Sequence, residues 1–387
     1  MKRSVPMKLI HTSDWHIGRT LFDYSLLEDQ AHFLKQLADY ALEIKADAIL
    51  VAGDIYNRAV PSAQAVELLD GVLERMVLRH GIPVIMIAGN HDSPQRLSFG
   101  SRLLKGAGLT IAGTPAARLE RAELPGGVDI YLLPYFYPAQ VRLLLEDDGI
   151  STFNDAFAAL MERNLPLLDR GRTNILMAHG FFSSLGRERE DMVFSSSELS
   201  IGMADIMDIT LASGFDYAAL GHLHAPQKVG ENARYSGSPL KYSLSESLHR
   251  KSVTLLEIEN GKVDISTHAF EPLRDVRTIA GPFEELANPA NQMDSSCGDY
   301  VYANILGDGA ILFAMQKLRA VFPNILGLSF ITPGQENGQP VHLGEDLSQR
   351  PVEELFGEFY RQITGEELSP GRAGLIEKLL KESKVQP

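Results

Sequence analysis

Five short polar segments in the first 224 residues carry side chains of the types that bind divalent metal ions. They are Asp14-Trp15-His16, Gly53-Asp54, Gly89-Asn90-His91-Asp92, His179-Gly180 and Gly221-His222-Leu223-His224. Each segment follows an apolar stretch that is typical of a β-strand. Because open α/β folds place their sites where parallel strands end, we expect the five segments to meet at one edge of a sheet.

The first metal ion is assigned to Asp14, His16 and His224. In an extended segment, Asp14 and His16 would project to the same side, so that one ion can bind both. Asp54 is the best candidate for a bridging ligand, since a carboxylate has two oxygens and can bind two cations. Each of these residues alone would be weak evidence, because a single Asp after a strand is more often a turn residue or a helix cap.

The second ion is assigned to Asp54, Asn90, His179 and His222. Nitrogen and oxygen ligands without a thiolate suit Mn²⁺, Fe²⁺ or Zn²⁺ better than Ca²⁺. His91 lies beside Asn90 in the sequence but is not needed as a ligand, so it can donate a proton to a leaving oxygen. Asp92 either orients His91 or a ligand, or has a plain turn role.

The charge of such a centre favours an anionic substrate. Two divalent ions bound by Asp14, Asp54 and a bridging hydroxide keep a net charge of roughly +1. Two ions about 4 Å apart also lower the pKa of a bound water toward about 7, which supplies a hydroxide for attack on phosphorus. The residues therefore predict hydrolysis of a phosphodiester.

The elements that position these segments follow a βαβ pattern. Predicted strands cover 8–11, 47–52, 83–88, 128–133, 174–178 and 217–220, and predicted helices cover 26–45 and 62–79. Strands that are uniformly apolar are covered on both faces. Residues 251–258 and 262–270 are predicted to form a hairpin around Glu259-Asn260-Gly261 and to close this domain.

The rest of the chain predicts a smaller lobe and a helical tail. We expect a first domain over 1–275 and a small α/β domain over 276–333, with strands near 278, 300–306 and 326–331 and helices near 283 and over 310–321. A linker over 334–347, rich in proline and glycine, precedes a helical segment over 348–387. The apolar stripes of that segment either pack on this chain or bind a partner protein.

Composition limits the functional classes. The net charge is −14 at pH 7, so any grip on nucleic acid must come from a local basic patch or from a partner. One cysteine, Cys297, fits a reducing compartment, and no apolar run approaches the roughly 20 residues needed to cross a bilayer. We therefore expect a cytoplasmic protein that does not enter a membrane.

The motifs together resemble a known family. The five segments match the calcineurin-like metallophosphoesterases, and longer stretches resemble the SbcD family, the nuclease subunits of bacterial SbcCD complexes, over essentially the whole chain. These stretches are His11-Thr12-Ser13-Asp14-Trp15-His16-Ile17-Gly18, Val51-Ala52-Gly53-Asp54-Ile55-Tyr56, Tyr235-Ser236-Gly237-Ser238-Pro239 and Arg350-Pro351-Val352-Glu353-Glu354-Leu355-Phe356. The resemblance implies an α/β fold with a layered β-sheet metallophosphoesterase core, helices outside, a small capping domain and C-terminal helices.

The resemblance also implies an activity and partners. Members of the family are Mn²⁺-dependent exonucleases and endonucleases that act on double-strand DNA ends and hairpins in repair and recombination. An SMC-like ATPase, SbcC, binds their C-terminal helices, and a nuclease homodimer forms part of a heterotetramer. By motif, His91 would be catalytic and the metal ligands would be those assigned above. Asn57 departs from the Asp or His that the family often has there, which puts a supporting role for this residue in doubt.

Several basic residues near the motifs could contact DNA phosphates or could be solvated surface residues. They are Arg19, Arg58, Arg96, Arg187 and Arg189. Two alternative functions remain open from the sequence. One is a stand-alone phosphoesterase that acts on nucleotides or phosphoproteins, and the other is a non-catalytic scaffold whose metal site is structural.

Overall fold

The structure is a computed structural model that describes residues 6–184, 192–195, 205–293, 295–307 and 311–331. Arg187, Arg189, the predicted linker over 334–347 and the predicted helical segment over 348–387 lie outside the described residues. The chain divides into two compact units, Met1–Asn304 with Ile311–Leu328, and Ile305–Ala310 with Ser329–Pro387. The helices and strands of the described residues lie in the first unit, apart from the ends of two strands that belong to the second.

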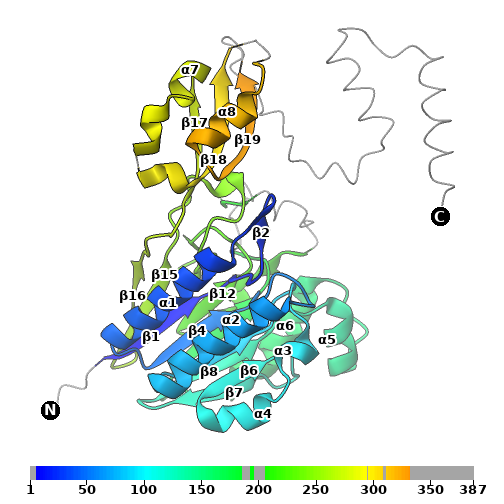
Figure 1. The fold of residues 1–387 in the computed structure, drawn as a ribbon. Coiled ribbons are helices and arrows are strands. Elements are labelled where there is room, and N and C mark those ends of the chain that lie inside the picture. Colours follow the sequence, from blue (N-terminus) through cyan, green and yellow to red (C-terminus); the bar gives the residue numbers. More distant parts are fainter. Residues whose placement is uncertain (1–5, 185–191, 196–204, 294, 308–310, 332–387) are drawn as a thin grey trace, which may run out of the picture. The chain divides into compact units, whose positions relative to one another are not determined.

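Two six-stranded sheets form the larger part of the first unit (Figure 1). The first has the order β16-β15-β1-β4-β5-β6, and its strands are β1 (Met7–Thr12), β4 (Ala48–Ala52), β5 (Val84–Ile87), β6 (Leu109–Ala112), β15 (Val253–Glu259) and β16 (Lys262–His268). Strands β1, β4, β5 and β6 are parallel, and β15 pairs antiparallel with both β1 and β16. The predicted hairpin is therefore confirmed, and it extends the sheet of the first strand.

The second sheet has the order β13-β14-β12-β9-β8-β7. Its strands are β7 (Glu120–Leu124), β8 (Val128–Leu133), β9 (Thr173–His179), β12 (Tyr217–Gly221), β13 (Gln227–Lys228) and β14 (Ala233–Tyr235). The central strands β8, β9, β12 and β14 are parallel, and the register pairs His179 with Gly221. The residues that follow β9 and β12 consequently leave the sheet side by side.

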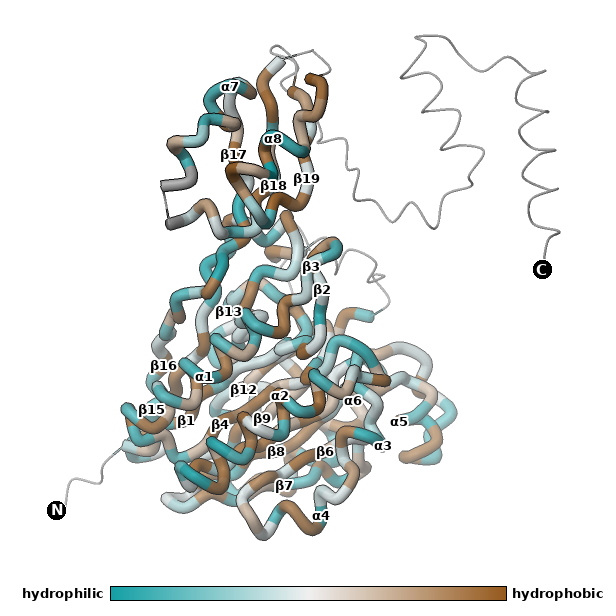
Figure 2. Tube along the Cα trace, viewed as in Figure 1, coloured by the Kyte–Doolittle hydropathy of each residue, from teal (hydrophilic) through white to brown (hydrophobic). Residues whose placement is uncertain are grey.

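The two sheets pack face to face and helices cover their outer faces. Along β4, Leu50 faces the inter-sheet core with Ile130 and Met177, whereas Ile49 and Val51 face the helices. Because side chains alternate along a strand, a wholly apolar strand supplies both cores. Figure 2 shows these strands mainly in the hydrophobic colour. The predicted α/β class with layered sheets and outer helices is confirmed.

The helices follow the predicted apolar spacing. Helix α1 (Leu27–Glu43) buries Phe33, Leu37 and Ala41 on one face, and α2 (Ala63–Leu73) begins where the Ser62 hydroxyl accepts a hydrogen bond from the Ala65 N–H at 3.2 Å. The predicted helix over 62–79 changes at residue 74 into a π-helix, Glu74–Arg79. None of the helices within the described residues is long and apolar enough to cross a membrane.

Shorter elements complete the core. They are β2 (Thr20–Leu21), β3 (Tyr24–Ser25), α3 (Pro94–Leu97), α4 (Ser101–Leu104), α5 (Pro138–Leu145), α6 (Phe153–Asn164), β10 (Phe182–Ser183) and β11 (Met207–Asp208), with 3₁₀ turns at Lys105–Ala107, Leu165–Leu167, Ile209–Ala212 and Leu244–Glu246.

A small lobe follows the hairpin. It contains β17 (Val276–Gly281), α7 (Phe283–Leu286), β18 (Tyr300–Leu306), α8 (Ala314–Val321) and β19 (Ile325–Ile331), with 3₁₀ turns at Pro289–Met293 and Ser295–Gly298. Its sheet has the order β17-β18-β19. The predicted elements are present, although α8 begins at Ala314 and not at residue 310. The predicted domain limits stay predictions.

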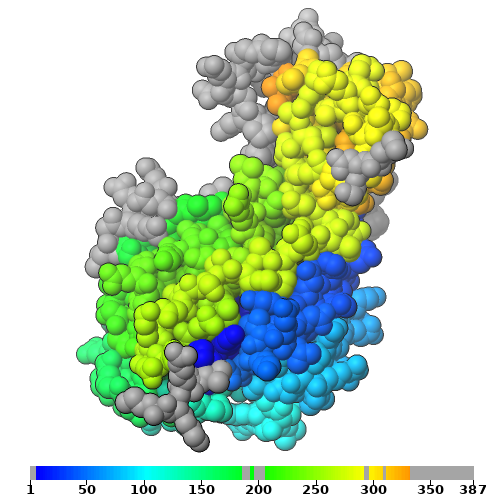
Figure 3. Space-filling view, turned by 90° about the vertical axis from the view of Figure 1, so that its left-hand side faces the viewer, coloured from blue at the N-terminus to red at the C-terminus, as the bar shows by residue number. Residues whose placement is uncertain are grey.

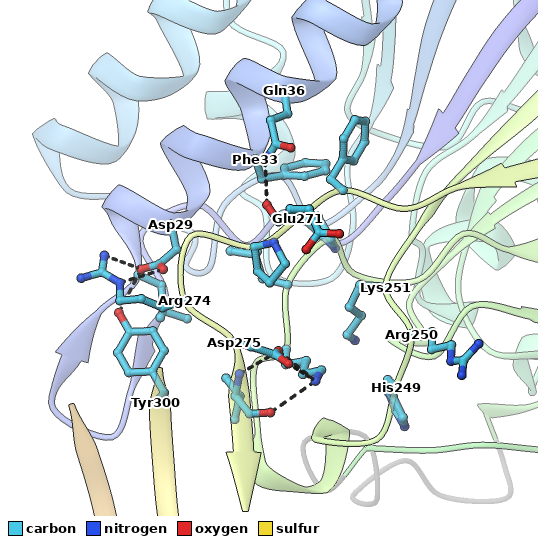
Figure 4. Close-up of a pocket in the computed structure, with 17 residues that line it drawn as sticks. Asp29, Phe33, Gln36, His249, Arg250, Lys251, Glu271, Arg274, Asp275 and Tyr300 are labelled. Atoms are coloured by element: carbon cyan, nitrogen blue, oxygen red, sulfur yellow. Dashed lines mark hydrogen bonds and ion pairs between the residues drawn. The ribbon is translucent and has the colours of Figure 1, made fainter. Parts of the chain in front are cut away.

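The segment between the hairpin and the lobe is fixed to α1. In Figure 3 the yellow-green segment around β16 runs beside the blue α1, where the rings of His268 and Tyr40 stack at 3.8 Å. Further along, the Asp29 carboxylate accepts hydrogen bonds from the Arg274 guanidinium and from the Tyr300 hydroxyl at 2.9 Å, beside a pocket of about 240 Å³ (Figure 4). Asp29 is buried, so these two donors balance a carboxylate that water does not reach.

Candidate metal centre

All five predicted segments meet between the two sheets. Asp14 and His16 follow β1, Asp54 follows β4, and Asn90 and His91 follow β5 of the first sheet. His179 ends β9, and His222 with His224 follows β12 of the second sheet. The expectation of a single sheet edge was therefore wrong, because the carboxyl ends of strands from both sheets enclose the site.

The backbone at this site is held in an unusual conformation. Asp14, His16, Asp54 and His222 have φ angles of 53°, 45°, 50° and 115°. The predicted extended segment at Asp14 and His16 was therefore wrong. Instead, the Asp14 N–H donates to the Gly53 carbonyl at 3.0 Å and the His16 N–H donates to the Asp54 carbonyl at 2.9 Å. Such conformations cost about 1–3 kcal/mol each and concentrate at functional sites.

Two glycines allow the segments to approach each other. Gly53 has a φ of 89°, and a Cβ there would overlap the His179 ring. A Cβ on Gly89 would overlap the Asp54 carboxylate. The glycines of the Gly53-Asp54 and Gly89-Asn90 segments are thus required by close contact with neighbouring candidate ligands.

The first group of candidate ligands contains Asp14, His16 and His224. One donor atom from each lies within 4.8 Å of the others. The Nε2 atoms of His16 and His224 face each other at 3.2 Å, and His16 Nε2 lies 3.5 Å from Asp54 Oδ2. All of these residues are buried. Their donor atoms converge in the way that one shared cation requires.

The second group contains Asp54, His179 and His222, again within 4.8 Å of one another. Asn90 joins it, because its Oδ1 lies 3.0 Å from both His179 Nε2 and His222 Nδ1. The same Asp54 Oδ2 that lies 3.5 Å from His16 lies 3.5 Å from His179 Nε2. One carboxylate therefore stands between the two groups, where a bridging ligand belongs.

The hydrogen bonds of His179 test whether a cation fits. Its Nδ1 lies 2.8 Å from the Ala52 carbonyl oxygen, which can only accept, so Nδ1 carries a proton. Its Nε2 then points at two acceptors, Asn90 Oδ1 and Asp54 Oδ2. A second proton or a metal ion must lie on that side. The donor set therefore fits divalent cations, with a neutral imidazole as the ligand.

The charges in the centre agree with this assignment. Burial would lower the pKa of His179, but the carboxylates of Asp54 and Asp14 outweigh it and raise the pKa to about 9. Burial and the neighbouring His179 lower the pKa of His222 to about 3. Burial would raise the pKa of Asp54, yet His179 and His16 hold it well below its usual range. In the metal-free protein, a proton on His179 therefore supplies the positive charge that a metal ion would otherwise bring to this position.

His91 lies at the open side of the two groups. Its N–H donates to Asp54 Oδ1 at 2.9 Å, and its Nδ1 lies 3.0 Å from the Asn57 carbonyl oxygen. The second ring nitrogen, Nε2, is therefore the one available to a substrate. Because the contact of Asn57 with His91 is made by the backbone, it does not depend on the residue type at position 57. The Asn57 side chain accepts a hydrogen bond from Arg19 at 3.3 Å.

Asp92 organises the loops around the ligands. Its carboxylate accepts hydrogen bonds from the N–H groups of Ile55, Tyr56 and Gly89 at 2.9–3.0 Å. Burial and the charge of Asp54 raise its pKa to about 6, against the effect of these donors. The sequence left two roles open for Asp92. These contacts favour the turn role, because they hold the Asp54 loop against the Asn90 loop.

The predicted basic residues are spread around the centre. Arg19 lies over the Tyr242 ring at 5.2 Å, close to the ligands. Arg58 is exposed, and Arg96 donates to the Ala59 carbonyl at 3.2 Å. Arg19 is linked to the candidate ligands through Tyr242, because the rings of Tyr242 and His16 lie 5.5 Å apart.

Sequence reasoning missed Glu246. This buried residue accepts a hydrogen bond from His224 Nδ1 at 3.0 Å and from the Tyr242 N–H at 3.2 Å, and it forms an ion pair with Lys251. Burial would raise its pKa, but Lys251 and His224 hold the pKa well below its usual range. A carboxylate on the far nitrogen of a histidine fixes the ring and leaves Nε2 for the metal.

Replacing Glu246 by glutamine is expected to weaken metal binding about 10- to 100-fold. The amide keeps the shape of the side chain but removes the charge that holds the proton on His224 Nδ1. Calorimetric titration of the metal-free protein with Mn²⁺ measures the change. The exposed Glu231→Gln is the control, and an unchanged Mn²⁺ affinity in Glu246→Gln would contradict the role assigned to Glu246.

Comparisons with known proteins agree with this geometry. The calcineurin-like phosphoesterase profile matches residues 7–226, and the profile described as the type 5 capsule protein repressor C-terminal domain matches residues 272–364. The chain is 32% identical over 380 residues to the D subunit of the SbcCD nuclease of Staphylococcus epidermidis, covering 97% of this chain and 98% of the relative. It is 31% identical over 375 residues to the corresponding protein of Staphylococcus saprophyticus, with the same coverage.

A crystal structure of a Thermus thermophilus protein covers 68% of the chain and 99% of that structure, at 13% identity and a TM-score of 0.40, which is too distant to carry an argument. The assignment comes from the sequence relatives and the matching profiles, which span both the two-sheet core and the segment after the hairpin. The chain belongs to the calcineurin-like phosphoesterases and, within them, to the family of SbcCD nuclease D subunits.

Proposed function

We propose that this chain is the nuclease subunit of an SbcCD-type complex and hydrolyses phosphodiester bonds of DNA with two divalent metal ions. The observation that carries the proposal is one carboxylate, Asp54, between two groups of converging ligands, with His91 at the open side. The first ion would be held by Asp14, His16, Asp54 and His224. The second would be held by Asp54, Asn90, His179 and His222.

The residues divide the chemical work. When bound, the two ions would supply a hydroxide from water at neutral pH and would bind a phosphate oxygen. Glu246 and the Ala52 carbonyl orient His224 and His179, so that each offers a lone pair to its ion. His91 Nδ1 carries a proton toward the Asn57 carbonyl, so His91 would donate to the leaving oxygen from Nε2 in its doubly protonated, imidazolium form. Mn²⁺ is the proposed metal, because the mixed nitrogen and oxygen ligands suit Mn²⁺, Fe²⁺ or Zn²⁺ better than Ca²⁺ and the family resemblance implies Mn²⁺.

Cleavage of DNA with and without the ATPase partner tests the function. The chain is purified with the partner, and Mn²⁺ is titrated on blunt and hairpin duplexes with and without ATP. We expect metal-dependent cleavage of both duplexes. Activity confined to small phosphate esters would favour the stand-alone phosphoesterase, and metal binding without any hydrolysis would favour the scaffold.

We further propose that the chain after the small lobe binds the ATPase. The match of the C-terminal profile to residues 272–364 and the amphipathic pattern of the predicted helices support this. Removing the residues after about 340 is expected to preserve metal-dependent hydrolysis of simple esters and to abolish co-purification with the ATPase and ATP-linked cleavage. A pull-down with the tagged ATPase measures this, and continued co-purification would refute the assignment.

A homodimer within a heterotetramer is also proposed. An apolar groove of about 590 Å³ on the first unit supports it, lined by Val66, Leu73 and Leu78 and by Phe99 and Leu104. Phe99 is 86% exposed and Leu78 is 68% exposed, so two large apolar side chains that line one groove face water. A second copy of the chain would cover this groove.

Replacing Phe99 by glutamate is expected to convert the dimer into a monomer. The charge would have to be buried in the interface, while the fold is spared because the side chain is exposed. Light scattering after size exclusion gives the mass of the protein in solution. Leu248→Glu is the matched control, since Leu248 is 92% exposed and does not line the groove. A Phe99→Glu protein with the mass of the wild type would exclude this interface.

We propose a cytoplasmic location, which the single cysteine supports.

A further inference from the structure

We infer that Tyr135, Tyr137 and Phe153 form an aromatic shelf beside the metal centre that stacks an unpaired nucleobase at the end of a DNA substrate. The inference rests on the proposed function and adds a binding site for a base to a centre that so far binds phosphate. Tyr135 and Tyr137 follow the strand over residues 128–133, to which no candidate metal ligand was assigned.

The topology places this strand next to the ligands. Strand β8 pairs in parallel with β9, and the register sets Leu133 beside Ala178, one residue before His179. The residues after β8 therefore leave the sheet at the edge where His179 does. The Tyr135 N–H then donates to the Ala88 carbonyl at 2.9 Å, which joins this segment to the loop that carries Asn90.

The side chains that follow β8 point alternately into the core and toward the metal centre. Phe136 is 2% exposed and packs in the core under the helices of the second sheet. Tyr137 is 57% exposed, and Tyr135 is half-buried. Burying Phe136 therefore turns its two neighbours outward, toward the open side of the metal centre.

The three rings lie next to one another beside a candidate metal ligand, inclined by 88° between Tyr135 and Tyr137, 46° between Tyr135 and Phe153 and 56° between Tyr137 and Phe153, so a base would stack on one ring at a time. The Tyr135 ring lies 6.5 Å from the His222 ring at an interplanar angle of 27°, and 6.3 Å from the His179 ring. It lies 5.3 Å from the Tyr137 ring, and Phe153 lies 6.0 Å from Tyr135 and 6.4 Å from Tyr137. A group bonded to a phosphate at the two ions would thus lie within reach of Tyr135.

A nucleobase is the occupant that this chemistry favours. Exposed aromatic rings stack bases of any sequence, as a nuclease without a fixed target requires. Stacking also needs no net positive charge, and this chain has a net charge of −14. A paired base inside a duplex is covered on both faces by its neighbours. A base freed from its pair at a terminus or in a hairpin loop can instead lie on a protein ring.

Fluorescence of a terminal base tests the shelf. Each duplex carries 2-aminopurine at the last position of one of its two strands, opposite a base with which it does not pair. Phosphorothioate linkages slow cleavage of the duplex. The full-length protein is titrated in Mn²⁺, and stacking on a tyrosine is read as quenching of the 2-aminopurine. We expect quenching by the wild type with at least one of the two labelled strands.

Variants separate the ring from the fold. Tyr137→Leu and Tyr135→Leu are expected to lose the quenching and to weaken binding of the mismatched end by roughly five- to hundredfold. Tyr137→Phe and Tyr135→Phe keep a ring and are expected to bind within about twofold of the wild type. Phe313→Leu is the control, because Phe313 is 64% exposed at the start of α8. Circular dichroism melting verifies that each variant is folded.

Three results would overturn the shelf. The first is equal binding and quenching by the wild type and the leucine variants, and the second is a loss in the phenylalanine variants as large as in the leucine variants. A wild type that cleaves DNA but quenches neither labelled strand also refutes the shelf while leaving the nuclease proposal intact. Absence of Mn²⁺-dependent cleavage by the wild type would instead refute the proposed function itself.

Discussion

His91→Ala is expected to lower the rate of DNA hydrolysis by about 10²- to 10⁴-fold while both metal ions stay bound. The His91 backbone N–H donates to Asp54 Oδ1 and the ring Nδ1 lies against the Asn57 carbonyl, so Nε2 faces the open side. Alanine keeps the backbone contact with Asp54 and removes the proton donor. The variant therefore separates proton donation from metal binding.

Two measurements check the His91 result. Mass spectrometry of the dialysed protein gives the metal content, and single-turnover cleavage of a labelled duplex gives the rate. His32→Ala is the control, since His32 lies on α1 and belongs to neither group of candidate ligands. Loss of metal in His91→Ala would assign His91 to the ligands, and an unchanged rate in that variant would show that His91 does not act in catalysis.

Asp54→Asn is expected to weaken binding of both ions by more than about 100-fold, and DNA hydrolysis should fall at least as far as in His91→Ala. Asp54 Oδ2 lies 3.5 Å from a histidine nitrogen of each ligand group, so its charge serves both. The asparagine side chain can still accept a hydrogen bond from the His91 backbone N–H, which preserves the loop. The effect therefore reports the loss of a shared negative charge.

Asp14→Asn is the matched comparison for Asp54→Asn. Asp14 belongs to one donor group only, with His16 and His224. We expect this variant to lose one ion and to retain the other, whereas Asp54→Asn loses both. The metal content at a fixed Mn²⁺ concentration distinguishes the two variants. Loss of a single ion from Asp54→Asn would show that the carboxylate does not bridge.

Local sequence patterns predicted the elements because the strands of the core are wholly apolar and end in polar segments. Strand β4 lies within the predicted range, and the polar segment Gly53-Asp54 follows it directly. The spacing of apolar residues does not show which strands share a sheet, so the prediction that all five segments meet at one sheet edge was wrong. The left-handed backbone at Asp14 and His16 also could not be predicted, since it is imposed by hydrogen bonds to Gly53 and Asp54.

The side chains around the ligands were harder to predict than the ligands themselves. Glu246 lies 22 residues after His224, and no spacing rule joins the two. Tyr135 follows a predicted strand but is not of a type that binds metal. The contacts of Asp92 with three backbone N–H groups depend on loops from two strands of the first sheet. Tertiary contacts of this kind are set by the complete fold.

The division of the ligands between two sheets has a consequence for biosynthesis. A nascent chain that has emerged only as far as Asn90 contains Asp14, His16 and Asp54 but no ligand from the second sheet. The proposed ligands of the second ion are complete only at His222 and those of the first ion only at His224, so neither ion could be fully coordinated before residue 222 has left the ribosome. Metal uptake would therefore be a late event, and the bound ions would stabilise the correct docking of one sheet on the other.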